Sequence, residues 1–297
     1  MSVVISTIIV NHNAGDFLRR CVESLLACSV ELEIIVIDNA STDGSALRLA
    51  AQTPVKLVSN GANLGFAAAC NVGARLASAP YLLFINPDCW VEPNSLARLL
   101  QALRGAGRVG MVGGLLVNPD GTEQAGSRRA IPTPWRAFVR AFGLAHFADR
   151  WPRLFSDFCL HKQPLPDHAV EMEAVSGACM MVSRQAMLDV GAWDEGYFLH
   201  CEDLDWCMRF RQKGWQILFV PSARITHACG VSSQGKRVFV EWHKHKGMVR
   251  FYRKFFRHQY PGPLMPLVAL GVWLRFALVA SYFSAHRGAR MLGFLRG

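Results

Sequence analysis

Two aspartates each stand at the end of an apolar run, where they could do polar chemistry at the edge of a sheet. Asp38 closes the run ELEIIVID, and Asp88 follows the apolar residues 82–85 through Asn86-Pro87. A proline and a carboxylate are poor continuations of a central strand, so the strand is expected to end there. Mg²⁺ is usually bound by one or two carboxylates together with the phosphates of a ligand. The pair predicts a metal-assisted nucleoside-diphosphate site; the alternative is that both acids belong to turns or helix caps.

The chain lacks the glycine-rich motifs that bind phosphate without such acids. It has no G-x-x-x-x-G-K-[ST], and no G-x-G-x-x-G follows its first apolar run. Carboxylates alone would repel a phosphorylated ligand, whereas a divalent cation held between them reverses that effect. One of Asp38 and Asp88 would then contact the nucleoside, and the other would bind the metal.

A second pair of acids stands at the start of an expected helix. The stretch EDLDWCMRFRQKG (202–214) has acids in its first turn and Gly214 at its end, as helices do. Glu202 and Asp203 follow the aromatic YFLH (197–200), and a carboxylate in a partly apolar mouth can act as a general base. The alternative is that both acids only interact favourably with the helix dipole.

Two other features have strong structural interpretations. Asp205 and Arg209 are four residues apart on the same expected helix, which predicts a surface ion pair. His227 follows the strand-like run WQILFVPSARIT and precedes Gly230. It is either a hydrogen-bonded structural histidine or a ligand of a metal or a diphosphate.

Alternating apolar patterns show which elements would position these side chains. Strands are expected at 3–10, 31–38, 55–60 and 81–86, and helices at 16–28, 44–52 and 66–78. This β-α-β order predicts an α/β fold with a mostly parallel central sheet flanked by helices. Ligands of such sheets lie beyond the carboxyl ends of the strands. The clusters 11–13, 38–39 and 86–88 should therefore meet at one edge and line a single crevice.

Composition and charge limit the class of protein. Half of the 297 residues are apolar, which indicates a folded chain with a large core. From Lys236 onward there are 12 Lys/Arg and one acid, so the remaining residues carry a net charge of about zero. A nucleic-acid-binding protein would place its basic residues on the folded body, and this body is neutral. The nine cysteines form no C-x-x-C pair, which favours reduced, buried thiols in a cytoplasmic protein. The N-terminus is expected to be a strand and not a signal peptide.

Two segments differ from the rest of the chain. Residues 128–168 hold tryptophans, arginines and prolines, and they are either an inserted lid-like, acceptor-facing segment or a plain packing helix. Residues 241–297 form a basic and apolar helical tail. Its apolar part, 264–285, is long enough to be considered for a membrane span, although Arg275 near its middle would be costly there. An interfacial or re-entrant helix is favoured over a span and over soluble packing.

With these residues in hand, the chain resembles the family 2 inverting glycosyltransferases of the GT-A fold, and most of all their rhamnosyltransferase-like branch. Seven motifs in order carry the resemblance: IIVNHN (8–13), IVIDNASTDGS (35–45), NLGFAAACNVG (63–73), FINPD (84–88), SGACMMVSR (176–184), GAWDEGYFLHCEDLDWCMR (191–209) and HACGVSS (227–233). The resemblance implies a glycosyltransferase domain over 1–240, with a nucleotide-sugar-binding half (1–125) and an acceptor or catalytic half (170–233). The tail beyond about 240 is outside it.

The resemblance also implies roles for single residues. On the donor side, Asn11 would lie beside the nucleotide and Asp38 would hydrogen-bond the pyrimidine, while Asn63, Gly65 and Asn71 would border the sugar nucleotide. Asp88 matches the last acid of the family's D-x-D motif and, with His227, would bind Mg²⁺ or Mn²⁺. Asn86 replaces the first acid of that motif, which removes one charge from the site. Asp203 matches the catalytic base, with Glu202 beside it.

The function implied is transfer of a sugar, with rhamnose favoured, from a dTDP- or UDP-sugar. The acceptor would be a polysaccharide or a polyprenyl-diphosphate-linked glycan in cell-surface polysaccharide synthesis. With the basic tail, this places the protein in the cytoplasm at the inner face of the cell membrane, with no nucleic-acid partner. The alternative is a non-catalytic sugar-nucleotide-binding or scaffold member of an assembly complex.

Overall fold

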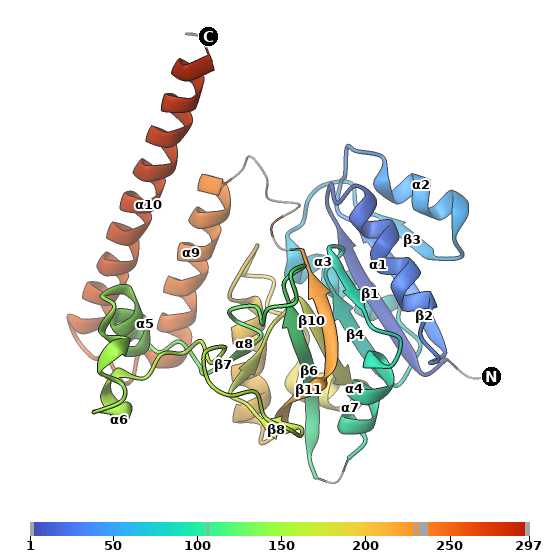
Figure 1. Ribbon diagram of the computed structural model, residues 1–297, viewed down its shortest axis with the longest axis horizontal. Helices are drawn as coiled ribbons and strands as arrows, with labels where there is room; N and C mark the ends of the chain where they lie inside the picture. The colour runs from blue at the N-terminus through green and yellow to red at the C-terminus, as the bar shows by residue number, and fades with distance from the viewer. Residues whose placement is uncertain (1–2, 106, 229, 231–236, 295–297) are drawn as a thin grey trace.

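A nine-stranded β-sheet forms the centre of the protein in the computed structural model, which describes residues 3–105, 107–228, 230 and 237–294 (Figure 1). The strand order is β3-β2-β1-β4-β10-β6-β11-β5, and β8 pairs with β11. The strands are β1 (Ile5–Asn11), β2 (Leu32–Asp38), β3 (Lys56–Ser59), β4 (Tyr81–Ile85), β5 (Cys89–Val91), β6 (Val109–Val117), β8 (Val170–Glu171), β10 (Cys179–Ser183) and β11 (Gln216–His227). Only β5, β8 and β10 run against the common direction, so the predicted mostly parallel sheet is confirmed.

Helices cover both faces of the sheet, as the sequence predicts. Side chains of β1 alternate between two hydrophobic clusters, with Ile5 and Ile9 in one and Ile8 and Val10 in the other. The first cluster includes residues of α1, α2 and α4; the second includes residues of α3, α7, α8 and the two C-terminal helices. The bounds are α1 (Asp16–Leu26), α2 (Ser45–Gln52), α3 (Phe66–Leu76), α4 (Ser95–Leu103), α7 (Arg184–Val190) and α8 (Glu202–Gln212).

Register brings the polar strand ends to one edge of the sheet. Asn11 stands opposite Asp38 in the parallel pair β1–β2, and Ile9 stands opposite Ile85 at the end of β4. The residues that follow Ile85 therefore leave the sheet beside those that follow Asn11. This confirms the expected meeting of the three clusters, because parallel strands end on the same side.

Strand β11 contains a bulge that changes its register against β6 before it reaches His227. The register of β11 against β6 shifts between Val220 and Arg224, so extra residues, among them Pro221, bulge out of the ladder. Gly114 of β6 lies under this bulge, and a Cβ there would be 2.4 Å from the carbonyl oxygen of Ala223. After the bulge, β11 continues to His227, which pairs opposite Cys89 of β5.

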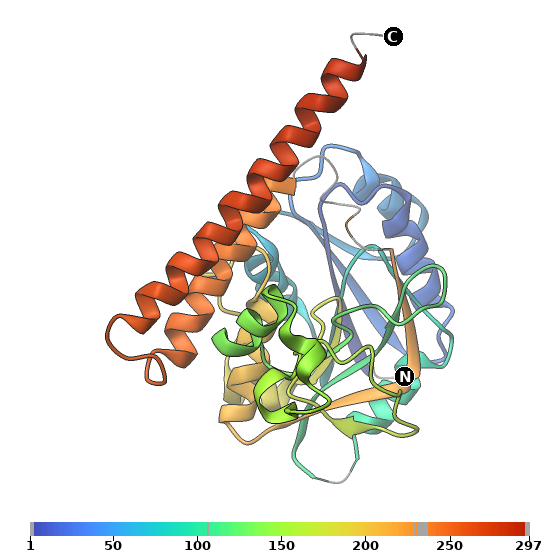
Figure 2. The same cartoon turned by 60° about the vertical axis from the view of Figure 1, so that its left-hand side comes forward.

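The segment 128–168 folds into a small layer on one side of the sheet. It holds β7 (Arg128–Arg129), α5 (Pro134–Ala141), the 3-10 helix η1 (Leu144–Phe147) and α6 (Pro152–Phe155). Strand β7 pairs with β9 (Ala174–Val175) in a separate two-stranded sheet. Figure 2 shows α5 and α6 on the same side of the molecule as the last helix.

The C-terminal tail is a helical hairpin of α9 (Arg237–Phe256) and α10 (Leu264–Phe294) (Figure 1). Trp242 packs on Trp273 with ring centroids 4.9 Å apart. Arg275 points at α9 and donates from Nη1 to Nε2 of buried His245, 2.8 Å away. Arg275, whose charge would be unfavourable in a membrane, therefore faces α9 and not the outer face of α10. Within the described chain, 264–284 of α10 is long and apolar enough to cross a membrane.

We predict that Gly114→Ala destabilises the fold through the bulge. The added Cβ meets a backbone carbonyl that cannot rotate away, so overpacking should lower the free energy of unfolding by about 1–3 kcal/mol. Urea unfolding followed by circular dichroism measures this change. Gly61→Ala is the control, because nothing lies within 4 Å of a Cβ at that position. Equal stability of the two variants would contradict the role given to the bulge.

Candidate functional site

The donor-side edge contains a buried polar network between the ends of β1 and β2. Asn11 Nδ2 donates to Asp38 Oδ1 at 3.0 Å and to the hydroxyls of Ser41 and Ser45, both also at 3.0 Å. The backbone N–H of Ser41 donates to Asp38 Oδ2 at 3.3 Å. Buried polar atoms are normally hydrogen-bonded, yet Asn11 Oδ1 has no partner in the described part of the chain. Asn11 and Asp38 are therefore brought together, and Oδ1 of Asn11 lies below the surface.

Asn39 joins this edge to the loop that precedes α3. Its Nδ2 donates to Asn63 Oδ1 at 2.8 Å, and its Oδ1 accepts from Asn60 Nδ2 and from the N–H of Leu64. Gly65 follows with φ +84°, a conformation that favours glycine. A Cβ on Gly65 would lie 2.6 Å from the carbonyl oxygen of Phe198. Asn63 and Gly65 thus lie beside the polar strand ends, and Gly65 packs against the loop before α8.

Asn71 has a different environment. It is buried on α3, where Nδ2 donates to the carbonyl of Trp193 (3.0 Å) and to Glu195 Oε1 (2.8 Å). Its Oδ1 accepts from the N–H of Trp193 at 3.0 Å. These bonds fasten the loop before α8 to the donor half.

Asp88 and His227 are brought side by side by the β5–β11 pairing. The distance from His227 Nε2 to Asp88 Oδ1 is 3.2 Å, and both side chains are buried. His227 Nδ1 donates to Gln124 Oε1 at 2.7 Å, which leaves Nε2 to face the carboxylate. A metal-ligating histidine typically has such an outer partner on its other nitrogen.

This donor set fits a divalent cation. Asp88, His227 and Cys89 each offer one atom within 4.8 Å of the others. Burial and the neighbouring Asp88 charge raise the pKa of the Cys89 thiol well above its usual value, so the thiol stays protonated. A carboxylate oxygen and an imidazole nitrogen remain, which suits Mg²⁺ or Mn²⁺ completed by phosphate oxygens. Asn86 is half-buried beside them. Residues 229 and 231–233 of the last motif lie outside the described residues.

At the N-terminus of α8, Asp203 is held by an arginine from the segment 128–168. Asp203 Oδ2 lies 2.5 Å from Arg129 Nη2 and 3.1 Å from the N–H of Gly177, which donates to it. Asp203 Oδ1 accepts the N–H of Leu204 at 2.8 Å. Burial opposes ionisation of Asp203, but the charge and hydrogen bond of Arg129 with the two N–H groups lower its pKa below the usual range.

The neighbouring Glu202 is in the opposite protonation state. Burial first, and then the charge of Asp203, raise its pKa to about 8. Its Oε2 has no hydrogen-bond partner in the described part of the chain. At neutral pH, therefore, Asp203 is the ionised acid of this pair and Glu202 is protonated.

Residues 177–178, just before β10, lie between the Asp88 site and Asp203 and contact both neighbourhoods. The N–H of Asn86 donates to the carbonyl of Ala178 at 2.9 Å, while the N–H of the preceding Gly177 contacts Asp203. A Cβ on Gly177 would lie 2.9 Å from the Cβ of Asp203. The residues before β10 thus separate the strand end that leads to Asp88 from the N-terminus of α8.

The predicted surface ion pair of Asp205 is wrong in its location. Asp205 does pair with Arg209 at 2.6 Å, but its carboxylate is fully buried. The other oxygen, Oδ2, contacts Lys254 of α9 at 2.6 Å, and Lys254 also pairs with Asp194. A buried carboxylate needs such compensation. Asp205 therefore fastens the C-terminal hairpin to α8.

Sequence reasoning missed two residues of the site, Gln124 and Arg129, whereas Asn39 belongs to the strand-end cluster 38–39 that it predicted. Gln124 and Arg129 lie 103 and 74 residues from their partners, in stretches without a chemical pattern. Only the burial of an acid, which demands a cation, could have suggested a partner such as Arg129.

Comparison with known proteins assigns this site to a family. The model for glycosyl transferase family 2 matches residues 6–170. The N-acetylglucosaminyl-diphospho-decaprenol L-rhamnosyltransferase of Mycobacterium tuberculosis is 32% identical over 240 residues, 76% of each chain. Rhamnosyltransferase WbbL of Escherichia coli K12 is 25% identical over 238 residues, 74% of this chain and 81% of WbbL. The chain belongs to glycosyl transferase family 2 and is a glycosyltransferase.

Solved structures agree on the fold. The mannosyltransferase PcManGT of Pyrobaculum calidifontis, solved with GDP-Man and Mn²⁺, superposes with a TM-score of 0.58 at 16% identity, covering 98% of this chain and 78% of PcManGT. GalNAc-T7, solved with UDP, GalNAc and Mn²⁺, gives 0.61 at 19% identity over 84% of this chain, which spans about half of that protein (48%). The architecture is the GT-A fold expected from the sequence.

We predict that Glu202 makes the protein less stable as the pH rises. Between its ordinary pKa of 4.5 and about 8, the native carboxyl keeps a proton that the unfolded chain releases. The free energy of unfolding should fall there by up to about 1.4 kcal/mol per pH unit, and Glu202→Gln should remove this contribution. Urea titrations at several pH values measure the slope. Exposed Glu31→Gln is the control, and equal slopes in wild type and Glu202→Gln would refute the assignment.

Proposed function

We propose that this protein transfers rhamnose from a dTDP- or UDP-sugar to a lipid-linked glycan in cell-surface polysaccharide synthesis, with inversion at the anomeric carbon. The observation that carries the proposal is the 32% identity, over three quarters of both chains, to a transferase named for rhamnose and a diphospho-decaprenol acceptor. The similarity to WbbL, also named a rhamnosyltransferase, supports the choice of sugar. The site described above contributes the residues.

On the donor side, Asp38 and Asn11 would hold the nucleoside. Asn11 fixes the Asp38 carboxylate through a 3.0 Å hydrogen bond, so that this carboxylate is oriented before the nucleoside binds. The Asn39 network holds Asn63 and Gly65 in place, so the wall beside the sugar is formed before the donor arrives. Such preorganisation lowers the entropic cost of positioning.

Asp88 and His227 would hold Mg²⁺ or Mn²⁺. The cation would offset the negative charge that develops on the leaving diphosphate. Gln124 Oε1 accepts a hydrogen bond from Nδ1 of His227, so that the proton stays on Nδ1 and the lone pair of Nε2 faces the metal position. Asn86 leaves the site with one carboxylate fewer than a D-x-D motif would.

Asp203 would act as the general base toward the acceptor hydroxyl. Its lowered pKa keeps it ionised at neutral pH, and Oδ1, which accepts only the N–H of Leu204, would take the proton. Arg129 and Gly177 meanwhile hold Oδ2 in place. The acceptor oxygen would attack the anomeric carbon on the face opposite the diphosphate, and the C–O bond to the diphosphate breaks as the new one forms. Glu202, protonated, would contribute a hydrogen-bond donor and no base.

The tail would hold the protein at the inner face of the cell membrane, with α10 lying in the interface. Leu267, Leu270, Leu274 and Leu278 form one row on α10, each more than half exposed. A helix spanning the bilayer would draw the antiparallel α9, rich in Lys and Arg, into hydrocarbon. An interfacial position keeps those charges at the level of anionic headgroups.

We predict that Asp203→Asn abolishes transfer and spares donor binding. Loss of the base should lower turnover roughly 10²- to 10⁴-fold, while the amide oxygen can still accept from Arg129 and Gly177. Transfer is measured as nucleoside diphosphate released and lipid glycosylated with a panel of dTDP- and UDP-sugars. Asp189→Asn, a surface acid paired with Arg108, is the matched control. Near-normal turnover by Asp203→Asn would rule out this base, and silence of the wild type with every donor would favour a non-catalytic role.

We predict that metal binding depends on Asp88 and His227. Asp88→Asn and His227→Ala should abolish tight Mn²⁺ binding in the presence of a nucleoside diphosphate, measured by calorimetry. Gln124→Leu should weaken it roughly 10- to 100-fold, because the imidazole loses the bond that orients it. Cys89→Ser should leave the affinity unchanged, and a large loss in that variant would show that the thiol is a ligand.

A further inference from the structure

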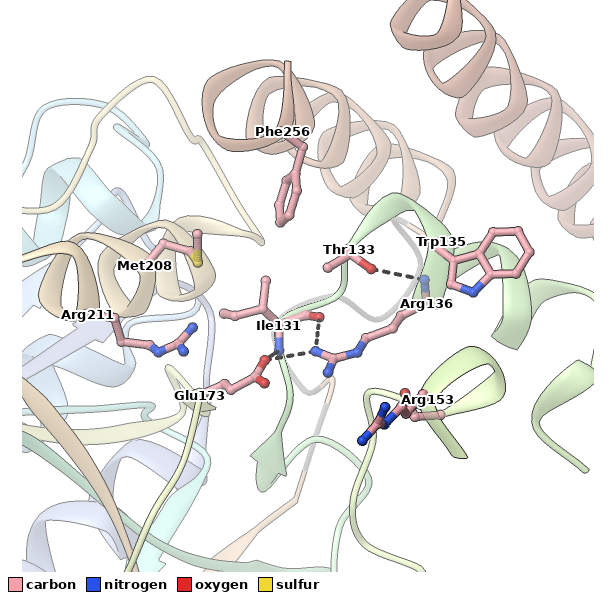
Figure 3. A pocket seen from close by; sticks show the side chains of 10 residues that line it. Ile131, Thr133, Trp135, Arg136, Arg153, Glu173, Met208, Arg211 and Phe256 are labelled. Carbon is pink, nitrogen blue, oxygen red and sulfur yellow. Dashed lines mark hydrogen bonds and ion pairs between the residues drawn. The ribbon is translucent and has the colours of Figure 1, made fainter. Parts of the chain in front are cut away.

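A cavity that is lined by none of the proposed nucleoside, metal or base residues lies between the segment 128–168 and the two helices α8 and α9. Its volume is about 350 Å³, and Figure 3 shows side chains from α5, α6, α8 and the end of α9 around it. The lining is both cationic and apolar. It includes Arg136, Arg153, Arg211, Glu173, Trp135 and Phe256.

The charges of the lining do not cancel. Glu173 Oε2 pairs with Arg136 Nη1 at 2.8 Å and also accepts the N–H of Ile131 at 2.6 Å (Figure 3). Arg153 and Arg211 form no ion pair within the described residues, although Arg211 is near enough to help lower the pKa of Glu173. The lining therefore carries two more positive than negative charges. Two such guanidinium groups, one from α6 and one from α8, that line the cavity from different sides are suited to phosphate oxygens (Figure 3).

Exposed aromatic side chains of α5 adjoin the apolar part of the cavity. Trp135 and Phe138, stacked on each other on α5, are both more than two-fifths exposed. Figure 2 shows α5, α6 and α10 on one side of the molecule. A cationic pocket that adjoins an exposed apolar surface suits an anionic amphiphile, with its charged head inside and its chain along the surface.

The cavity is connected to the proposed base through two elements. Ile131, in its wall, comes two residues after Arg129, which contacts Asp203. Arg211 is eight residues beyond Asp203 on α8, roughly 12 Å along the helix axis. That separation is of the size of one sugar followed by a diphosphate.

We propose that this cavity binds the diphosphate group of the lipid-linked acceptor, with Arg153 and Arg211 as its phosphate ligands. The identity of the acceptor rests on the proposed function. The prediction that the cavity binds a diphosphate-bearing lipid does not rest on the proposed function, because it depends only on the charges and the apolar surface of the cavity.

The test is calorimetric binding of farnesyl diphosphate to the full-length protein in EDTA, which keeps metal-dependent binding at the donor site out of the measurement. The double variant Arg153→Ala/Arg211→Ala should bind it roughly 10- to 100-fold more weakly than wild type, because two charged hydrogen-bonding groups are lost. Arg75→Ala, an exposed arginine on α3 without an ion pair in the described chain, is the matched control and should bind normally. Binding of nucleoside diphosphate with Mn²⁺ should be equal in all three proteins, which shows that they are folded.

Further probes separate the head, the chain and the bulk lipid. Farnesol and inorganic diphosphate should each bind wild type more weakly than farnesyl diphosphate, since each lacks half of the recognised chemistry. Equal binding of farnesyl diphosphate by wild type and the double variant would overturn the proposal. The double variant could instead lose tenfold affinity for phosphatidylglycerol vesicles and none for farnesyl diphosphate. That result would also overturn the proposal, because it would assign the two arginines to the binding of bulk lipid. These experiments measure binding and not sugar transfer. Their outcome therefore still decides whether the cavity binds a diphosphate lipid, even if the protein proves not to transfer rhamnose.

Discussion

Buried carboxylates need compensating charges or donors, and this constraint connects the separate segments of the protein. Asp203 of α8 meets Arg129 at the entrance of the segment 128–168, and Asp205 of the same helix meets Lys254 of the C-terminal hairpin. Asp88 meets His227 across the β5–β11 pair. Each acid thus takes its partner from a part of the chain distant in sequence. The groups proposed for chemistry and the groups that hold the segments together are neighbours on one helix.

The two acids at the start of α8 show how environment divides one pair into two states. Glu202 and Asp203 are adjacent and both buried, yet the pKa of Glu202 is raised and that of Asp203 is lowered. The difference follows from Arg129 and the N–H of Gly177, which hydrogen-bond to Asp203, whereas no hydrogen bond from either to Glu202 is found in the described part of the chain. Mutual repulsion makes a single ionised acid the favoured state. A site with one defined base is the consequence.

The architecture separates a polar edge from an apolar face. The polar edge is formed by the ends of β1 and β2 and by the amide networks around Asn11 and Asn39. Exposed aromatic and leucine side chains on α5, α6 and α10 suit the headgroup region of a bilayer. Helix α8, which carries Asp203, contacts both the stretch before β10 and the C-terminal hairpin. Such a division suits the proposed transfer from a soluble donor to a lipid-linked acceptor.

The sequence by itself determined the alternation of strands and helices, the convergence of Asn11, Asp38 and Asp88 at one edge, and the acids at the start of α8. These features depend on local patterns of apolar residues and on the rule that parallel strands end together. Only the tertiary structure decided that Asp203 pairs with Arg129, that Asp205 is buried against Lys254, and that Arg275 faces α9. Those outcomes depend on contacts between residues 30 to more than 100 positions apart, such as Arg275 with His245 and Gln124 with His227. No local pattern encodes them, because they arise from how whole elements pack and from the cost of leaving a buried charge unpaired.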